Sequence, residues 1–173
     1  MRIKFTSAIL LVALMFSCKS ATTHQEADTT ATANYEVIPA PQMISKPSMN
    51  ANKPFVLTAN TKITYPKGDV DLERYAGFLK EYIQKQSGIA LNIAPEEGKP
   101  SNNIVLLQNY NNENKEGYQV NIDSDHITIN GASKAGTFYG VQFLRKSIPV
   151  LKTKKIIFQL IYKFIMKCRK NFI

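Results

Sequence analysis

Residues 116–148, EGYQVNIDSDHITINGASKAGTFYGVQFLRKSI, carry the strongest structural pattern in the chain. Apolar and polar residues alternate over 118–122 and again over 127–130, which is the period of a β-strand with one buried face. The polar residues 123–126 between these two runs are typical of a turn. The first half of the stretch therefore predicts a β-hairpin.

The second half of the stretch changes to a helical period. Phe138, Val141 and Leu144 recur at the spacing of one helix face, and Ser133 is a suitable N-cap in front of them. Pro149 lies just beyond the last apolar residue of this pattern, where a helix is expected to have ended. A hairpin followed directly by a helix is therefore predicted.

Two glycines, Gly136 and Gly140, lie four residues apart inside this predicted helix. Each costs roughly 1 kcal/mol of helix stability relative to alanine. Their presence calls for a packing reason, and we expect the helix backbone to approach the sheet closely at both positions.

Six short runs carry a resemblance to a known family: EGY at 116–118, ITI at 127–129, GTFYGVQFL at 136–144, VIPAP at 37–41, FVL at 55–57 and TKI at 61–63. Together they resemble the small N-terminal domain of β-N-acetylhexosaminidases of glycoside hydrolase family 20. The likeness covers about residues 35–150, with the minor difference that the family commonly has Thr where Phe143 stands. The run at 136–144, in its hairpin-to-helix setting, is the most specific part.

The resemblance also implies where the chemistry of such enzymes lies. Family members place their catalytic site in a (β/α)8 barrel that follows the small domain, where an adjacent Asp-Glu pair works together with the substrate's own N-acetyl group. Such a barrel needs about 250 residues, and positions 151–173 leave far fewer. We therefore expect a truncated β-N-acetylhexosaminidase-like chain that is inactive alone, with no catalytic, cofactor-binding or metal-binding residue. The family activity is the release of terminal N-acetylhexosamine from glycans, a step of carbohydrate metabolism.

The middle of the chain completes the predicted fold. Leu72, Leu79 and Ile83 share one face of a second predicted helix, which Asp69 or Asp71 caps and a glycine at position 88 ends. The apolar run at 104–107 predicts a central strand that is buried on both faces. The element order predicts an α/β (α+β) two-layer sandwich, with one mixed β-sheet and two main helices packed on it. The expected core consists of Tyr75, Leu79, Ile83, Val105, Leu107, Val120, Ile127, Ile129, Phe138, Val141 and Leu144.

The N-terminus predicts export. Residues 1–18 begin with Arg2 and Lys4 and continue with an apolar segment that is too short to span a bilayer, as in a signal peptide. The run MFSC that ends at Cys18 resembles a loose bacterial lipobox, so we expect cleavage before Cys18 and attachment of a lipid to its thiol. An ordinary signal peptide with an incidental cysteine is the alternative. Residues 19–34 are polar and predict a flexible tether to the domain at 35–150. The predicted location is the bacterial cell envelope, as an outer-membrane or periplasmic lipoprotein held to the membrane by its lipid.

The C-terminal segment 151–173 is strongly basic. It contains seven Lys or Arg and no acidic residue, whereas residues 19–150 carry 13 of each sign, so most of the net charge of +9 lies here. The neutral domain argues against a nucleic-acid partner. Three interpretations of this basic apolar tail remain open: a membrane-surface helix, a docking element for a partner, or a disordered out-of-frame end. The third is favoured, because the residue types are those of A/T-rich codons and the family pattern stops near Pro149.

Several motifs suggest chemistry and have simpler explanations. Asp123 and Asp125 suggest an acid/base pair, but Asp-Ser-Asp is also common in turns. The run 131–137 resembles a phosphate-binding loop without its lysine. His24 and His126 have no metal ligand at a suitable spacing.

Cysteines and tyrosines complete the candidates. Cys18 and Cys168 are not expected to form a disulfide, because the first is the predicted lipid site and the second lies in the tail. Tyr110, Tyr118 and Tyr139 are candidates for a sugar-stacking platform, although buried aromatic residues are the favoured explanation. A non-catalytic surface lipoprotein module that binds glycans or another protein is accordingly the alternative function. A domain that packs beside a barrel is also expected to expose an apolar patch.

Overall fold

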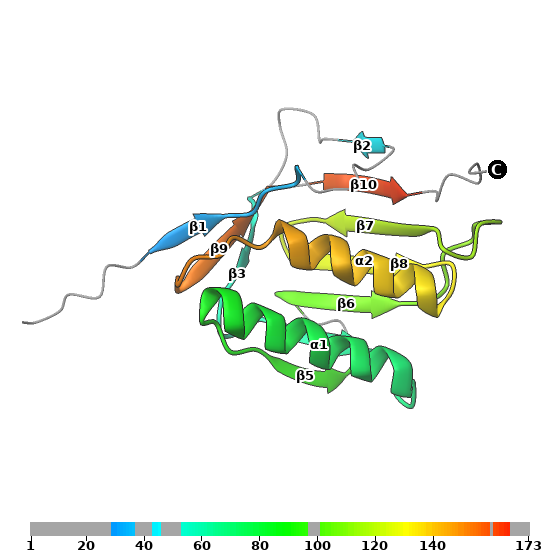
Figure 1. The fold of residues 1–173 in the computed structure, drawn as a ribbon, viewed down its shortest axis with the longest axis horizontal. Coiled ribbons are helices and arrows are strands. Elements are labelled where there is room, and N and C mark those ends of the chain that lie inside the picture. Colours follow the sequence, from blue (N-terminus) through cyan, green and yellow to red (C-terminus); the bar gives the residue numbers. More distant parts are fainter. Residues whose placement is uncertain (1–28, 37–42, 46–52, 97–100, 160, 167–173) are drawn as a thin grey trace, which may run out of the picture.

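The computed structural model describes residues 29–36, 43–45, 53–96, 101–159 and 161–166 (Figure 1). Two helices and ten strands occur in this part of the chain. They are β1 (Thr30–Thr32), β2 (Met43–Ser45), β3 (Phe55–Leu57), β4 (Lys62–Tyr65), α1 (Val70–Ser87), β5 (Asn92–Pro95), β6 (Asn103–Leu107), β7 (Tyr118–Ile122), β8 (His126–Gly131), α2 (Lys134–Ser147), β9 (Lys155–Phe158) and β10 (Ile161–Met166).

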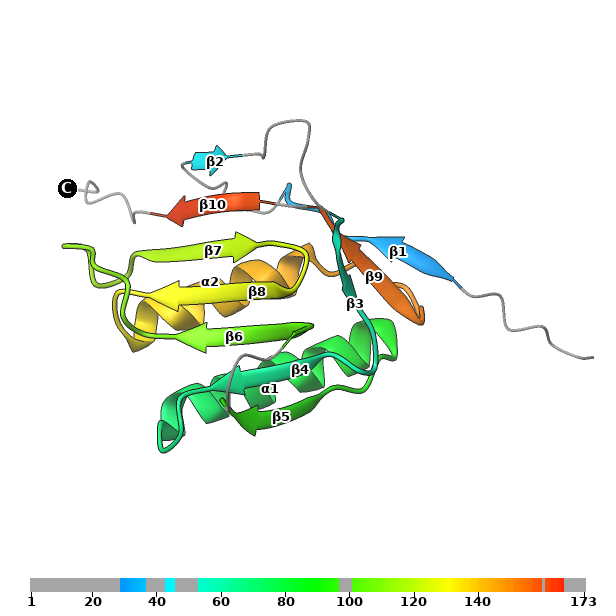
Figure 2. The same ribbon diagram turned by 180° about the vertical axis from the view of Figure 1, so that it is seen from behind.

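The larger sheet has seven strands in the order β2-β10-β7-β8-β6-β4-β5. Strands β4, β5, β6 and β8 are parallel, and β7 and β10 join them in antiparallel pairings, so the sheet is mixed. Both helices cover one face of this sheet, α1 over β4, β5 and β6 and α2 over β7 and β8. The view from behind shows the other face of the sheet in front of the helices (Figure 2). The helix-on-sheet layers of the prediction are confirmed.

The hairpin forms in the register that the alternation predicts. Val120 pairs with Ile129 and Ile122 pairs with Ile127, and all four side chains are buried. Asp123 closes the turn, because its Oδ1 accepts the backbone N–H groups of residues 125 and 126 at 2.8 and 2.7 Å. The hairpin residues therefore face the helices with one apolar side.

Helix α2 starts and packs as predicted. The Ser133 side chain accepts the N–H of Gly136 at the N-terminus. A Cβ on Gly140 would lie 2.5 Å from Ile129 Cγ2, and one on Gly136 would lie 2.3 Å from the carbonyl oxygen of Gly117. These two glycines thus let the helix backbone rest directly on the sheet and on the loop that enters β7.

Helix α1 has the predicted caps as well. Asp69 accepts the N–H groups of Asp71 and Leu72, and Gly88 ends the helix with a φ of 84°. Strand β6 is central and its Ile104, Val105 and Leu106 are buried, as a strand covered on both faces requires.

The prediction of one sheet is wrong. A second, three-stranded sheet has the order β1-β9-β3, with β1 parallel and β3 antiparallel to β9. Its central strand β9 lies in the basic segment 151–173 that was set aside as a tail. Phe55 and Leu57 of β3 and Ile156 and Phe158 of β9 are fully buried. Strand β3 pairs with β9, so its partner in the second sheet comes from the segment after residue 150.

The folded part is also longer at both ends than the predicted domain of residues 35–150. Ala31 and Ala33, which lie in the predicted tether, are buried because β1 pairs with β9. Strands β9 and β10 extend the described fold beyond residue 150. The signal peptide and the tether up to residue 28 lie outside the described residues.

Most of the expected core is buried, with three exceptions. Leu107 is half-buried because it is the last residue of β6. Tyr75 and Phe138 are half-buried because they meet each other, with ring centroids 5.3 Å apart, where α1 and α2 run side by side. The helical period predicted that each residue lies on the apolar face of its helix, but not how far the side chain would be exposed to solvent.

Candidate interaction surface

The outer side of the helix layer carries an apolar groove. It runs between α1 and α2, has a volume of about 360 Å³, and is lined by Phe78, Leu79, Glu81, Tyr82, Lys85, Phe138, Val141, Gln142 and Arg145. We call this set the helix groove. Leu79 and Val141 are buried core residues and form the floor of the groove, whereas Phe78 is exposed.

Aromatic rings dominate the helix groove. Phe78 is 49 % exposed, and Tyr139, which follows the groove residue Phe138 on α2, is 43 % exposed. Monomeric proteins seldom leave several large apolar side chains together in water unless they serve a contact. The groove is therefore a candidate surface for binding another protein surface or a ligand.

Arg145 supplies the polar part of the groove. Its guanidinium carbon lies 4.9 Å from the centroid of the Tyr82 ring, an arrangement in which the cation is attracted to the ring face. Its Nε is buried and has no hydrogen-bond partner among the described residues. The charged side chain therefore forms part of the wall of the groove beside the Tyr82 ring.

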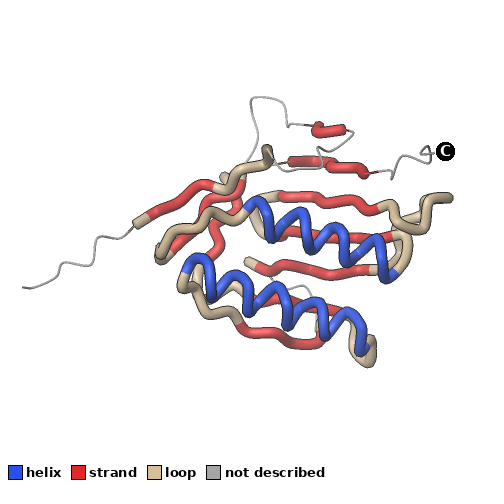
Figure 3. Tube along the Cα trace, in the orientation of Figure 1, coloured by secondary structure: helices blue, strands red, loops and turns tan. Residues whose placement is uncertain are grey.

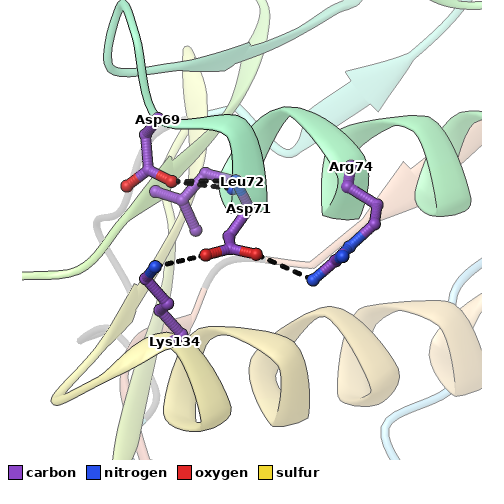
Figure 4. A network of polar contacts seen from close by, with 5 residues as sticks. All are labelled: Asp69, Asp71, Leu72, Arg74 and Lys134. Atoms are coloured by element: carbon purple, nitrogen blue, oxygen red, sulfur yellow. Dashed lines mark hydrogen bonds and ion pairs between the residues drawn. The ribbon is translucent and has the colours of Figure 1, made fainter.

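A charged network joins the two helices at one end of the groove (Figure 4). Asp71 in the first turn of α1 accepts from Lys134, the first residue of α2, and from Arg74 at 2.7 Å. The hydrogen bond from Lys134 holds the pKa of the Asp71 carboxyl below its usual range, and the same contact raises the pKa of Lys134. This network fixes the N-terminal ends of the helices to each other.

We expect replacement of Lys134 by Ala to raise the pKa of Asp71. The folded-state pKa of Asp71 is lower than that of the unfolded chain, so its contribution to stability is present above about pH 3.8 and is lost as the pH falls through the folded value. The raised pKa of Lys134 has the opposite sign, and its contribution is lost as the pH rises through that value. An NMR titration of the Asp71 carboxyl carbon measures the shift, with Lys80→Ala as the control. An unchanged titration in Lys134→Ala would contradict the assignment.

The two candidate aspartates belong to the turn and not to a reaction centre. Asp123 Oδ1 accepts two backbone N–H groups, and Nδ1 of His126 lies 3.5 Å from the same oxygen. Asp125 accepts from Ser124 and lines a separate hollow near Asn102. The favoured interpretation as turn residues is confirmed.

The three candidate tyrosines do not form one platform. Tyr118 is 3 % exposed beneath Gly140, and burial raises the pKa of its hydroxyl. Tyr110 lies in the loop before β7, and Tyr139 lies exposed on α2. The favoured buried-aromatic explanation holds for Tyr118, whereas Tyr139 is exposed and its ring centroid lies 6.3 Å from that of the groove residue Phe138.

The glycine-rich run 131–137 is a packing element. The Thr137 hydroxyl, buried, donates to the carbonyl of Leu107 at 2.7 Å. A Cβ on Gly131 would collide with the backbone N of Thr137. The run therefore serves to bring the start of α2 onto the end of β8.

In the part of the chain that the structure describes, His, Cys, Asp and Glu do not gather in threes in a way that could hold a metal ion. The predicted lipid site Cys18, together with His24 and Cys168, lies outside the described residues. Among the described helices, none is both long and apolar enough to cross a bilayer.

Sequence reasoning missed the helix groove and the Asp71–Lys134 contact. For the groove a signal was available, because Phe78 and Tyr139 are large apolar residues outside the predicted core faces. The contact between Asp71 and Lys134 joins residues 63 positions apart, and no local pattern predicts it.

The comparison with protein families decides the identity of the fold. Residues 34–161 match the family model described as glycosyl hydrolase family 20, domain 2. The chain belongs to glycosyl hydrolase family 20. The matched domain is the non-catalytic N-terminal domain of β-N-acetylhexosaminidases, and the match includes β9, eleven residues past the boundary that the sequence predicted. The predicted resemblance is confirmed.

Solved structures show the same fold. The GH20 β-N-acetylhexosaminidase from Streptomyces coelicolor A3(2) aligns with a TM-score of 0.59 and 22% identity over 75% of this chain and 26% of its own. A mutant Streptomyces plicatus β-hexosaminidase in complex with the product GlcNAc aligns with a TM-score of 0.59 and 21% identity. This alignment covers 75% of this chain and 25% of the enzyme. The GH20 exo-β-N-acetylglucosaminidase from Vibrio harveyi in complex with N-acetylglucosamine aligns with a TM-score of 0.56 and 16% identity. This alignment covers 82% of this chain and 20% of the enzyme. A search of curated proteins gave no match.

The chain spans about a quarter of the length of these structures. The parent GH20 enzymes contain a catalytic domain besides this one. The described residues form the α/β domain and no (β/α)8 barrel.

Proposed function

We propose that this family-20 domain is the accessory domain of an exported β-N-acetylhexosaminidase, and that its helix groove packs against the catalytic domain. The observation that carries this proposal is the groove between α1 and α2, which is lined by Phe78, Tyr82 and Phe138 and in which Phe78 is 49 % exposed. The hydrolysis of terminal N-acetylhexosamine then takes place on the catalytic domain, and this domain supports it structurally.

The domain alone is expected to lack hydrolase activity. The two candidate carboxylates, Asp123 and Asp125, lie in the hairpin turn, where Asp123 accepts two backbone N–H groups and Asp125 accepts from Ser124. An assay of the purified chain with a chromogenic N-acetylglucosaminide measures this. Turnover above that of a tag-only control would contradict the accessory role.

The docking role predicts self-association of the isolated chain, because the helix groove has no partner there. Phe78→Asp is expected to reduce association, since it places a charge at the groove. Light scattering over a concentration series measures the mean mass, and Val70→Asp is the matched control because Val70 is 74 % exposed at the start of α1, outside the groove. A wild-type chain that stays monomeric at high concentration, or equal effects of both variants, would count against docking through the groove.

Glycan binding is the second candidate function. The exposed rings of Phe78 and Tyr139 favour it, because sugar rings stack on open aromatic faces. Titration with N-acetylhexosamine oligomers, followed by tyrosine fluorescence in this tryptophan-free chain, separates the two functions. A saturable change that Tyr139→Ala abolishes supports glycan binding, whereas no change leaves the docking role.

We propose further that the protein is exported and anchored by a lipid on Cys18, in the bacterial cell envelope. The basic start with Arg2 and Lys4, the short apolar segment and the run MFSC support this. Incorporation of labelled palmitate into the wild type, and its loss in Cys18→Ala, tests the anchor.

A further inference from the structure

Both helices end, and the first described strand begins, at the same end of the molecule. Helices α1 and α2 both finish there, the loop 148–154 between α2 and β9 crosses it, and β1 begins there (left in Figures 1 and 3). Thr29, the first residue that the structure describes, lies at this end. The chain from the predicted lipid site at Cys18 therefore enters the domain here.

Hydrogen bonds hold the loop 148–154 in place. The N–H of Thr153 donates to the carbonyl of Ser87 at 2.9 Å, and Lys152 Nζ donates to the carbonyl of Lys85 at 2.9 Å. The N–H of Lys154 donates to the carbonyl of Thr29 at 3.2 Å. These hydrogen bonds connect the loop to the end of α1 and to the start of β1, so the residues that follow its tip are held in place.

The tip of the loop is apolar and fully open. Val150 is 80 % exposed and Leu151 is 52 % exposed, and they are adjacent in the sequence. They account for two of the five large hydrophobic side chains that are exposed in the described part of the chain. The other three lie on the helices, so this pair needs an explanation separate from the helix groove.

Lysines precede and follow this apolar tip in the chain, and one more lies at the same end of the molecule. Lys146 precedes it in the last turn of α2, Lys152 and Lys154 follow it, and Lys85 lies in the last turn of α1. Residues 146–159 contain no acidic residue. Of the three acidic residues of α1, Asp71 and Glu73 lie in its first turn at the opposite end of the molecule, and Glu81 lies one turn before Lys85.

We propose that this end is a membrane-contacting surface that binds anionic phospholipid bilayers. Val150 and Leu151 insert among the headgroups, and the lysines pair with lipid phosphates, the combination by which peripheral proteins bind anionic bilayers. The occupant is a lipid surface because an exposed apolar pair flanked by lysines in the chain complements anionic headgroups above an apolar layer. A lipid on Cys18 would bring the same end to the bilayer, but the contact does not depend on it.

The orientation is tested with single tryptophan reporters, because the chain contains no tryptophan. Leu151→Trp places a reporter in the proposed contact, and Val70→Trp places one at the opposite end, where the Val70 side chain is 74 % exposed. The full chain is mixed with vesicles of phosphatidylglycerol and brominated phosphatidylcholine. We expect a blue shift and quenching for Leu151→Trp and neither for Val70→Trp. Equal responses of the two reporters, or no response of Leu151→Trp, would overturn the proposal, including the case in which residues 1–28 alone bind the vesicles.

The charge contribution is tested by co-sedimentation with the same vesicles. Replacing Lys152 and Lys154 by Gln is expected to lower partitioning about 30-fold, since each lysine near an anionic surface contributes about fivefold. Lys67→Gln with Lys115→Gln, two exposed lysines at the opposite end, is the matched control and is expected to change partitioning less than twofold. Equal losses in the two pairs would show attraction by net charge alone and would contradict a defined surface. Thermal melts of all variants confirm that the fold is intact, and the reporter experiment does not depend on the lysine variants.

Discussion

Replacement of Gly136 by Ala is expected to lower the free energy of unfolding by about 3 kcal/mol, at the upper end of the range for overpacking. The new Cβ would lie 2.3 Å from the carbonyl oxygen of Gly117, which is a backbone atom and cannot turn away. That carbonyl also accepts the N–H of Ala132 at 2.9 Å. A shift large enough to admit the methyl group would therefore weaken the hydrogen bond that joins the loop before β7 to the start of α2.

Gly77→Ala is the matched control for this experiment. Gly77 lies inside α1, and a Cβ there would meet nothing within 4 Å. The same change is expected to stabilise the protein by about 1 kcal/mol, the difference in helix propensity. Urea unfolding measures both variants. If Gly136→Ala were neutral or stabilising like Gly77→Ala, the close approach of α2 to the loop would be wrong.

The sequence predicted the parts of the fold in which local patterns and tertiary contacts agree. The hairpin follows from alternation, and its turn from Asp123, because both depend on residues that are neighbours in the chain. The glycines at 136 and 140 predicted close packing because a helix interior offers no other benefit to glycine. The family resemblance added the accessory-domain assignment, which the family match confirms.

The second sheet was missed because its strands are short and distant in sequence. Thr30 pairs with Lys155, and Phe55 pairs with Phe158, over separations that no periodic pattern can reveal. The basic composition of residues 151–173 also obscured the alternation of β9, in which Ile156 and Phe158 are buried while Lys155 and Ile157 are only half-buried. Composition over a whole segment was a poor guide where four residues decide the structure.

The sequence predicted that the domain exposes an apolar patch, but not where on the fold this patch lies. An accessory domain was expected to expose an apolar patch, and the helix groove is such a patch. Its position depends on how α1 and α2 lie against each other, which the contact between Tyr75 and Phe138 and the Asp71–Lys134 network determine. Both are contacts between separate helices, and the sequence specifies neither the distance nor the angle between them.

Replacement of Phe158 by Ala is expected to cost about 3–5 kcal/mol of stability, as for other buried phenylalanines. Phe158 is 0 % exposed, and its ring meets that of Phe55 in an edge-on arrangement with centroids 6.3 Å apart. The lost side chain would leave a cavity between β9 and β3, and β9 cannot move to close it because it is paired on both sides, with β1 and β3. Such a loss is a large fraction of the stability of a domain of this size.

This prediction decides whether the segment after residue 150 belongs to the fold. Leu151→Ala is the matched control, because Leu151 is 52 % exposed in the same segment and its loss is expected to change stability by less than about 0.5 kcal/mol. Thermal and urea unfolding of both variants measure the difference. Since β9 is the central strand of the second sheet, a true tail would give two equal and negligible effects, and that result would remove β9 from the core together with the pairings of β1 and β3.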